Sequence, residues 1–437
     1  MCESRYRCTD PAHRPFARGA AEIRAGRRTV LTGAAAGMVF STAALGAEPA
    51  AAAPNPKRTK KRCYVLVTDG CRPDEVDSGL MPNLFEMREQ GMWWPRATSM
   101  PVMETIPNHV MMMTGVRPDK SGVPANSIYD REEGVIRDLD RPSDLKRGTV
   151  IQKLNRKGFR TGTVLSKEYL YGIFGQRATY QWEPAPIIPV SGHAPDIFTM
   201  QATMEMLDEF DPHLMFVNLG DIDRLGHTDY TGTTLQVLRQ AGLAQTDVLI
   251  GQFLDELKAS GRWEDSIVIV LADHSMDWSN PGDIVQLQPL MDADDMLNGN
   301  VVIADNGGAD LVYWTGPARQ RKEAIKRIKK IARQHEGVLK PWNRKADWLR
   351  LGPEAGDVVV FCKAGWRFSD PDFYSNPIPG NHGHPATRPI PFFIGGGHPA
   401  VKAGQVRPHH ARTIDVAPTV AKFFGLGLKP YEGRARI

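Results

Sequence analysis

The chain has 437 residues, of which 41% are hydrophobic and 24% are charged. This is the composition of a globular protein with ample core-forming material, and it excludes a wholly disordered or fibrous chain. The formal net charge is +4, and residues 1–53 contribute +3 of it (seven Arg less four acidic residues). The rest of the chain is nearly neutral, so its charge gives no support for nucleic acid as a partner.

Residues 1–53 have the pattern of a twin-arginine export signal. Arg27 and Arg28 precede a Gly- and Ala-rich stretch without a charge until Glu48, and small residues suited to cleavage lie at 46–53. A retained membrane anchor is the alternative. Because Ala and Gly are only weakly apolar, we favour removal, and no stable membrane span is expected afterwards. We therefore expect the protein to be exported, to the periplasm, cell wall or exterior.

Residues 54–62 form a basic stretch that we interpret as a solvated linker instead of a binding patch. Three cysteines follow it: Cys63, Cys71 and Cys362. None belongs to a Cys-x-x-Cys pair, so a thiolate zinc site is not expected. At most one disulfide can form among them, and its pairing stays open.

Three short apolar runs predict buried strands of a parallel sheet, and each ends in carboxylates. Residues 63–68 lead to Asp69, residues 213–220 to Asp221 and Asp223, and residues 266–272 to Asp273. Helical patterns at 81–91 and 234–258 lie between these strands. We predict an α/β fold with a doubly wound, mostly parallel central sheet flanked by helices, and with its site at the carboxyl ends of the strands.

Between 281 and 379 the pattern is less regular. Strands are expected at 301–304, 310–314 and 357–361, and a basic helix at 319–335. We interpret this region as a continuation of the sheet plus a smaller inserted cap. A strand at 391–394 and a helix at 413–424 restore the regular pattern, so residues 63–437 are expected to form one catalytic domain that includes the cap.

The segment 103–115 predicts a helix that begins near Pro107 and ends at Gly115. Thr105 then lies at or before the first turn, close to unpaired backbone N–H groups that favour an oxyanion. Taken alone, a threonine at this place is more commonly an N-cap. Thr105 is nevertheless our candidate nucleophile, because the rest of the chain offers groups that could activate it.

Those groups are carboxylates and imidazoles. The strand-end acids converge at one sheet edge, and burying them together without a cation would be costly. Oxygen and imidazole donors without thiolates suit Zn²⁺ with an open position, or another divalent first-row ion. Six ligands divide into two sites of three, and two ions held close together can bind the attacking and the leaving oxygen of an in-line displacement at phosphorus. The candidate ligands are Asp69, Asp223, His227, Asp273, His274 and His382.

The order and spacing of these motifs resemble the alkaline phosphatase superfamily and, within it, the nucleotide pyrophosphatase/phosphodiesterase family. The resemblance covers the chain from Cys63 onward. The matching segments are 68–70, 105–115, 118–126, 223–227, 272–276, 381–383 and 414–419.

The resemblance implies two zinc ions. One would be bound by Asp69, Asp273 and His274 and would contact the Thr105 hydroxyl; the other would be bound by Asp223, His227 and His382. Thr105 would become phosphorylated during turnover. Asn126 and the Thr105 backbone N–H would hold a non-bridging phosphoryl oxygen. His109 and His384 are assigned structural roles.

The expected substrate is a small phosphodiester or nucleotide-like phosphoester. Asn218 stands where nucleotide-hydrolysing relatives carry an aromatic residue, which puts nucleotide preference in doubt. A phosphomonoesterase or phosphonate hydrolase is the alternative on this scaffold and would need an extra cation; whether Arg72, Lys167 or Arg224 reaches the site stays open. An exported, non-catalytic metal- or ligand-binding protein is the alternative of another class. The oligomeric state is not predicted.

Overall fold

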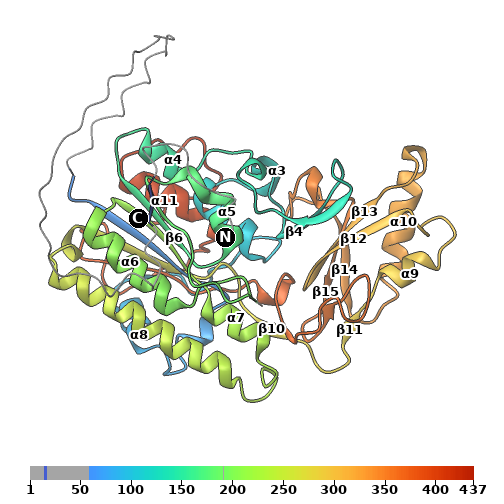
Figure 1. Cartoon of the computed structure of the whole chain (residues 1–437), viewed down its shortest axis with the longest axis horizontal. Helices are drawn as coiled ribbons and strands as arrows, with labels where there is room; N and C mark the ends of the chain where they lie inside the picture. Colours follow the sequence, from blue (N-terminus) through green and yellow to red (C-terminus); the bar gives the residue numbers. More distant parts are fainter. Residues whose placement is uncertain (1–13, 17–58, 190) are drawn as a thin grey trace, which may run out of the picture.

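The computed structural model describes residues 14–16, 59–189 and 191–437 (Figure 1). Apart from Arg14–Phe16, the predicted export signal lies outside the described residues, as does most of the predicted linker at 54–62. Within the described ranges, no helix combines the length and the apolar character needed to cross a membrane.

A mixed central sheet organises the molecule. Its strands follow the order β7-β6-β8-β2-β9-β18-β3-β19, and β1 (Arg14–Phe16) pairs with β7. β7, β6, β8, β2 and β9 run parallel, whereas β18 is antiparallel to β9. This confirms the predicted mostly parallel α/β sheet. The bounds are β2 Arg62–Thr68, β3 Met92–Trp93, β6 Thr161–Leu165, β7 Tyr180–Trp182, β8 Leu214–Leu219, β9 Ser266–Leu271, β18 Phe392–Gly395 and β19 Gln405–Val406.

The three strands predicted to end in carboxylates are neighbours at the centre of this sheet. In β2, Thr68 pairs with Leu219 of β8, and Val67 pairs with Leu271 of β9. All three strands are buried along their whole length, as continuous apolar runs in parallel sheets usually are. The register therefore brings the residues that follow the strands to one edge.

Helices cover both faces of the sheet (Figure 1). One face carries α1 (Pro82–Gln90) and α6 (Asp196–Phe210), and both pack on α8 (Val237–Ala259). The other face carries a second set of packed helices. They are α2 Thr105–Thr114, α4 Val150–Asn155, α5 Glu168–Phe174 and α11 Val416–Phe423, with the short α3 Pro118–Ser121 beside α2.

Helix α2 begins at Thr105, with Glu104 in the N-cap position, and ends at Gly115, which has the left-handed φ of 66°. The N-cap role considered for Thr105 is therefore wrong, because its backbone is already helical. Its hydroxyl and N–H both lie in the first turn, where backbone donors have no intrahelical acceptor.

A second, four-stranded antiparallel sheet forms the cap, in the order β12-β13-β15-β14. Its strands are β12 Val301–Asn306, β13 Ala309–Trp314, β14 Val338–Asn343 and β15 Val358–Cys362, with α9 (Gln288–Asp292) and α10 (Arg321–Ala332) packed against it. In the described chain none of these strands joins the central sheet, so the expected continuation of that sheet is wrong. The reason is local: the tight turn at Gly307 and Gly308 pairs β12 directly with β13.

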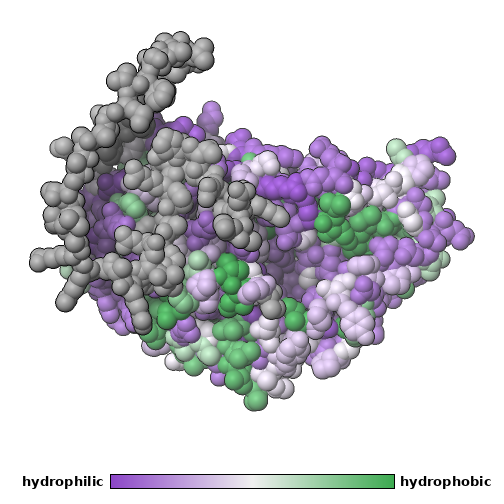
Figure 2. All heavy atoms as spheres, viewed as in Figure 1, coloured by the Kyte–Doolittle hydropathy of each residue, from purple (hydrophilic) through white to green (hydrophobic). Residues whose placement is uncertain are grey.

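Three two-stranded ladders connect the cap with the central body. They are β4 Ser127–Asp130 with β5 Val135–Asp138, β10 Asp277–Trp278 with β17 Gly380–Asn381, and β11 Ile284–Val285 with β16 Arg367–Phe368. On the face shown in Figure 2, the described surface is mostly hydrophilic and its hydrophobic residues gather in small patches.

Cys63, Cys71 and Cys362 are free thiols, and all three are buried. Burial raises the pKa of each thiol. The open question of their pairing is thereby answered in this structure: they pack as small apolar side chains.

Candidate active site

Three buried carboxylates meet at the sheet edge. Asp69 follows β2, Asp273 follows β9, and Asp223 lies in α7 (Asp221–Thr228), which follows β8. None is more than 1% exposed. Each has one oxygen without a hydrogen-bond partner: Oδ1 of Asp69, Oδ1 of Asp223 and Oδ2 of Asp273. Buried carboxylate oxygens left in this way favour a bound cation.

Three histidines direct their Nε2 atoms at the same place. The Nδ1 atom of His274 contacts Ser275 O at 3.0 Å, and that of His227 contacts Gly380 O at 2.8 Å. His382 Nδ1 lies 2.9 Å from Glu104 Oε1. With the proton on Nδ1, each neutral imidazole presents a lone pair at Nε2, the arrangement typical of metal-binding histidines. Burial alone would lower the pKa of His382, but Glu104 outweighs it and raises the pKa to about 9, so a metal would displace a proton from this ring.

The Nε2 atoms lie among the unpartnered carboxylate oxygens. His274 Nε2 is 3.4 Å from Asp273 Oδ2, and His227 Nε2 is 3.3 Å from Asp223 Oδ1. The Nε2 atoms of His227 and His382 are 3.0 Å apart. Burial holds the pKa of His274 well below its usual range, and the neighbouring His382 lowers it further. His274 is therefore neutral and able to bind a metal.

Two sets of three buried residues each offer ligand atoms that lie within 4.8 Å of one another inside the set. One set is Asp223, His274 and His382, and the other is Asp69, His109 and Asp273. These sets are consistent with a binuclear metal site. His274 lies between the two sets. Its ring stacks on that of His382 at 3.6 Å, but its Nε2 is also 3.4 Å from Asp273 Oδ2 and 3.7 Å from Asp69 Oδ1, the partners of the predicted grouping. Carboxylate and imidazole donors fit Zn²⁺ or another divalent first-row ion.

His109 belongs to one of these sets, but both of its ring nitrogens have other partners. Nδ1 donates to Thr105 O at 2.9 Å, and Nε2 accepts from Asn218 Nδ2 at 3.0 Å. This is compatible with the predicted structural role. His384, also assigned a structural role, lies in neither set, and its Nε2 is 3.3 Å from Asp277 Oδ2.

Thr105 stands over this cluster. It is 1% exposed, and its Oγ lies 3.2 Å from His274 Nε2 and 3.4 Å from Lys167 Nζ. Asn126 lies beside it: Oδ1 accepts from Ile106 N at 2.8 Å, and Nδ2 donates to Glu104 Oε2 at 2.6 Å. The structure thus brings Thr105 and Asn126 together with all six candidate ligands.

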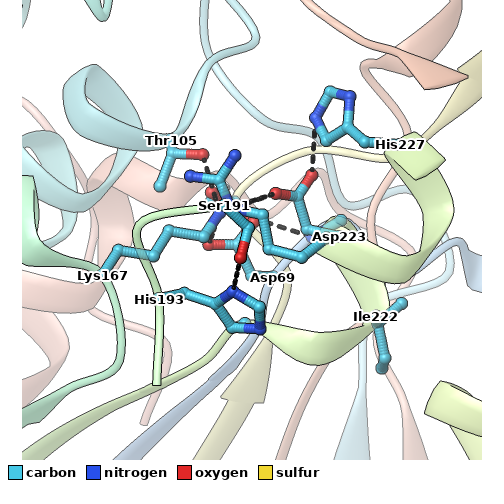
Figure 3. A network of polar contacts seen from close by, with 12 residues as sticks. Asp69, Thr105, Lys167, Ser191, His193, Ile222, Asp223 and His227 are labelled. Carbon is cyan, nitrogen blue, oxygen red and sulfur yellow. Dashed lines mark hydrogen bonds and ion pairs between the residues drawn. The ribbon is translucent and has the colours of Figure 1, made fainter. Parts of the chain in front are cut away.

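Of the three cations whose position the sequence left open, two reach the site. Lys167 is fully buried, and its Nζ contacts Asp69 Oδ2 at 2.8 Å and Asp223 Oδ2 at 2.7 Å (Figure 3). Burial alone would lower the pKa of Lys167, but these two carboxylates outweigh it and raise the pKa. Lys167 is therefore a cation that joins one carboxylate from each set of ligands.

Arg224 lines the cavity in front of the cluster, and its Nη2 donates to the Tyr169 hydroxyl at 3.2 Å. Arg72 does not reach the cavity. Its guanidinium binds the Asp74 carboxylate and the Met276 carbonyl instead.

Asn218 does not lie at the substrate-facing position that its motif suggested. It is fully buried in β8, beneath the ligands, and its Nδ2 donates to Asp69 Oδ2 at 2.8 Å. Ser166 Oγ donates to its Oδ1 at 2.6 Å. A side chain here cannot stack on a substrate, so the doubt about nucleotides that was drawn from Asn218 is withdrawn.

A network of buried polar residues holds α7, and with it Asp223 and His227. Asp196 Oδ1 accepts from Gly220 N at 2.7 Å, and Asp221 Oδ2 accepts from Asp196 N at 3.0 Å. His193 Nε2 lies 3.0 Å from Asp221 Oδ1, and its Nδ1 contacts the Ser191 hydroxyl at 2.6 Å (Figure 3). Asp221 is thus occupied in fixing the helix start, whereas Asp223 faces the cluster.

Sequence reasoning missed Glu104 and left Lys167 unplaced. Glu104 connects two candidates, since its oxygens contact Asn126 Nδ2 and His382 Nδ1. Lys167 follows strand β6, so it obeys the same strand-end rule as the three aspartates. That signal was available, but the run Thr161–Leu165 contains Gly162 and two Thr and was not recognised as a strand.

A cavity of about 350 Å³ opens in front of Thr105, between the central body and the cap. The central body contributes Thr105, Tyr169, Asp223, Arg224 and His227. The cap side contributes acids and amides. They are Asp305, Asn306, Asp370 and Asn376.

A buried threonine at a helix start, beside two sets of Asp and His ligands at the edge of an α/β sheet, defines the class of metal-dependent hydrolases with an alkaline-phosphatase-like fold. The family described as "Type I phosphodiesterase / nucleotide pyrophosphatase" matches residues 64–385. The chain belongs to this family, which confirms the family predicted from the motifs.

Similar proteins agree with this assignment. The Xenopus laevis bis(5'-adenosyl)-triphosphatase enpp4 is 22% identical over 397 residues, covering 85% of this chain and 79% of its own length. The mouse ectonucleotide pyrophosphatase/phosphodiesterase family member 1 is 24% identical over 225 residues, which cover 48% of this chain. The match spans only 23% of that relative's length.

Two solved structures share the fold. Murine ectonucleotide pyrophosphatase/phosphodiesterase 5 has a TM-score of 0.69 at 17% identity, covering 85% of this chain and 97% of its own. Phosphonoacetate hydrolase from Sinorhizobium meliloti has a TM-score of 0.66 at 19% identity, covering 84% of this chain and 95% of its own.

Proposed function

We propose that this protein is an exported two-zinc phosphodiesterase that acts through a phosphothreonine at Thr105. One observation carries the proposal: three unpartnered carboxylate oxygens and three histidine Nε2 atoms form one cluster, and the Thr105 hydroxyl lies 3.2 Å from His274 Nε2 of that cluster. The proposed ligands are Asp69, Asp273 and His274 for one ion and Asp223, His227 and His382 for the other. The export route and the identity of the metal are parts of this proposal.

When bound, the two ions would act as Lewis acids, lowering the pKa of the Thr105 hydroxyl and neutralising phosphoryl charge. Thr105 Oγ attacks phosphorus, the P–O bond to the leaving alcohol breaks, and a phosphothreonine forms. Water then attacks that phosphorus and releases Thr105. Two in-line displacements give net retention at phosphorus.

The surrounding residues hold the substrate and the proposed ligands in position for these steps. The Thr105 N–H lies in the first turn of α2, and the Asn126 amide lines the same cavity, so both can donate to a non-bridging oxygen. Lys167 holds Asp69 and Asp223 in place and lies within 3.4 Å of Thr105 Oγ. Glu104 orients both Asn126 and His382.

A phosphonate hydrolase or phosphomonoesterase is a second candidate, favoured by the two cations beside the site. Lys167 and Arg224 could meet the extra negative charge of a dianionic group. However, Lys167 is already neutralised by two carboxylates, which leaves Arg224 as the one Lys or Arg among the described residues that line the cavity. Comparing kcat/KM for p-nitrophenyl phosphate and bis-p-nitrophenyl phosphate separates the two candidates.

Thr105→Ala tests the nucleophile. We expect turnover of bis-p-nitrophenyl phosphate to fall by on the order of 10³-fold while two metal ions per chain remain bound, measured by elemental analysis. Thr114→Ala is the matched control, because the hydroxyl of this second buried threonine of α2 contacts only backbone away from the site, donating to Val110 O and accepting from Val116 N. Undiminished activity of Thr105→Ala would refute the mechanism. A wild type that is active without bound metal would refute the metal site, whereas a wild type without metal and without activity would favour a binding protein.

A further inference from the structure

The basic helix predicted from the sequence at 319–335 is α10, and its outward face lies outside the active-site cavity. The buried face of α10 packs on the cap sheet and carries Ala324, Ile328 and Ala332. On the opposite face, Lys and Arg recur at intervals of four, three, one and three residues, which is the spacing of a single helix face. We call these residues the basic stripe; they are Lys322, Lys326, Lys329, Lys330 and Arg333.

Four of the five stripe cations have no counter-charge. Lys326 Nζ lies 3.3 Å from Glu323 Oε2, but no described carboxylate lies within 4.0 Å of the other four. The remaining two cations of the helix, Arg321 and Arg327, are paired with aspartates of the cap. Four members of the stripe are exposed and one is half-buried, so the fold leaves this face charged and open to solvent.

The stripe lowers the stability of its own helix. Its members are neighbours on successive turns, and like charges three or four residues apart repel one another. Burial lowers the pKa of Lys329, and the neighbouring Arg333 lowers it further. A polyanionic partner would supply the missing negative charge to the whole stripe at once.

Charge is distributed unevenly over the molecule. Residues 54–437 have a net charge of +1, which is the total of +4 less the +3 of residues 1–53. Within them, residues 319–333 hold eight Lys or Arg and a single acid, a net charge of +7. The remainder of 54–437 therefore has a net charge of −6 before any metal is bound. An anionic surface would attract the α10 end of the molecule selectively and so orient the protein.

The stripe lies far from the sheet-edge site. Figure 1 shows α10 at one end of the molecule's long axis, on the cap and away from the central sheet. Both α9 and β14 pack against α10, and each exposes a leucine: Leu290 is 38% exposed and Leu339 is 49% exposed. This end of the cap therefore combines a row of cations with apolar side chains on the neighbouring elements.

These features favour a lipid surface over a nucleic acid. Clusters of about four to eight Lys or Arg on a helix bind anionic headgroups, and exposed leucines can enter the headgroup region. Neither leucine has a role on a nucleic acid backbone, and residues 319–334 contain no aromatic ring on which an unpaired base could stack. Because its apolar face already packs on the cap sheet, α10 would lie on the lipid surface without inserting into it.

We propose that the basic stripe binds the surface of a bilayer that contains anionic lipids, with Leu290 and Leu339 at the level of the headgroups. The inference goes beyond the proposed function and does not depend on it, since it concerns where the protein resides and not which bond it breaks. It assigns the outer end of the cap to membrane association.

Cosedimentation with lipid vesicles tests the proposal on the full chain. One set of vesicles contains phosphatidylcholine alone, and the other contains about 30% phosphatidylglycerol, which makes its surface anionic. At about 0.05 M NaCl we expect the wild type to partition at least about 100-fold more strongly onto the anionic vesicles. The preference should disappear at about 0.5 M NaCl, because salt screens exposed charges.

Replacing four stripe cations by Gln should remove most of this preference. The fourfold variant carries Lys322→Gln, Lys329→Gln, Lys330→Gln and Arg333→Gln. Since each cation near an anionic surface is worth about fivefold in binding, we expect the partition onto anionic vesicles to fall by on the order of 10²-fold.

The matched control removes the same charge from exposed residues of the central body and should bind as the wild type does. It carries Arg147→Gln, Lys157→Gln, Lys402→Gln and Lys429→Gln. Residues 1–62 are identical in all three proteins, so the contribution of their own basic side chains cancels in the comparison.

Equal partition of the fourfold variant and its control overturns the inference, as does a wild type without preference for anionic vesicles. Tighter binding of duplex DNA than of anionic vesicles at the same salt concentration also overturns it and assigns the stripe to a linear polyanion. If circular dichroism shows that the fourfold variant does not fold, the double variant Lys330→Gln and Arg333→Gln decides, with an expected loss of about 25-fold.

Discussion

At the scale of single residues, neighbouring side chains orient the proposed ligands. They hydrogen-bond the ligand-residue atoms that would not bind the metal and leave the other atoms free. Asn218 donates to Asp69 Oδ2, which leaves Oδ1 facing the cluster. Asn218 also donates to His109 Nε2, and His109 Nδ1 donates to Thr105 O. One amide therefore connects a ligand with the backbone of the proposed nucleophile. Such outer contacts usually decide how tightly a metal is held.

We predict that Asn218→Leu weakens metal binding about 10- to 100-fold, because Asp69 loses the donor that orients it. The measurement is Zn²⁺ affinity by competition with a chromophoric chelator. Thr163→Val on neighbouring β6 is the control, since it changes a similarly buried polar side chain that contacts no proposed ligand. Equal affinities of the two variants would show that Asn218 is merely a core residue.

At the scale of elements, helix α7 delivers Asp223 and His227 as one rigid piece. Asp196 fixes its start by accepting from Gly220 N and Asp221 N, and Thr246 Oγ donates to Asp196 Oδ2. Without these acceptors, two buried N–H groups at the helix start would lose their partners.

Asp196→Ala should therefore destabilise the protein by about 2–4 kcal/mol and lower its metal content, because α7 no longer holds its two ligands in register. Chemical denaturation and elemental analysis measure the two effects. Thr246→Val removes only the hydroxyl donor and should cost about 1 kcal/mol with full metal content. Full metal content in Asp196→Ala would contradict the positioning role.

The strands and helices that could be predicted from the sequence are those whose own residues carry a clear hydrophobic pattern. The runs at Cys63, Leu214 and Ser266 are largely apolar, so their strands and the convergence of Asp69, Asp223 and Asp273 followed from composition and topology. Lys167 was not placed, because Gly162 weakens the strand signal before it. The separate cap sheet and the burial of Asn218 depend on pairing partners distant in sequence, which no local pattern records.

At the scale of the whole molecule, the C-terminal segment secures the helix that carries Thr105. Glu432 N donates to Gly115 O at the end of α2. Its carboxylate accepts from Arg117 N at 2.8 Å, from Lys120 Nζ at 2.9 Å and from Arg350 Nη2 at 2.9 Å. The tail, α3 and the segment after β14 therefore meet at one carboxylate.

This carboxylate predicts a pH dependence of stability. Burial would raise the pKa of Glu432, but the donors from Arg117, Lys120 and Arg350 outweigh it and lower the pKa from 4.5 to about 2. A lowered pKa means that the ionised form stabilises the fold above pH 4.5 and that this contribution is lost as the pH falls toward 2. After allowance for solvent screening, it amounts to about 1 kcal/mol.

Glu432→Gln should accordingly lower the free energy of unfolding by about 1 kcal/mol at pH 7, and the difference from wild type should shrink by more than half at pH 3. Urea unfolding at the two pH values measures it, and comparison at each pH cancels any loss of metal common to both proteins. Glu354→Gln, which removes a surface partner of Lys146, serves as the control and should change stability little at either pH. If Glu432→Gln destabilises equally at pH 7 and pH 3, the carboxylate acts through packing, and the ionic connection between the tail and α2 contributes nothing to stability.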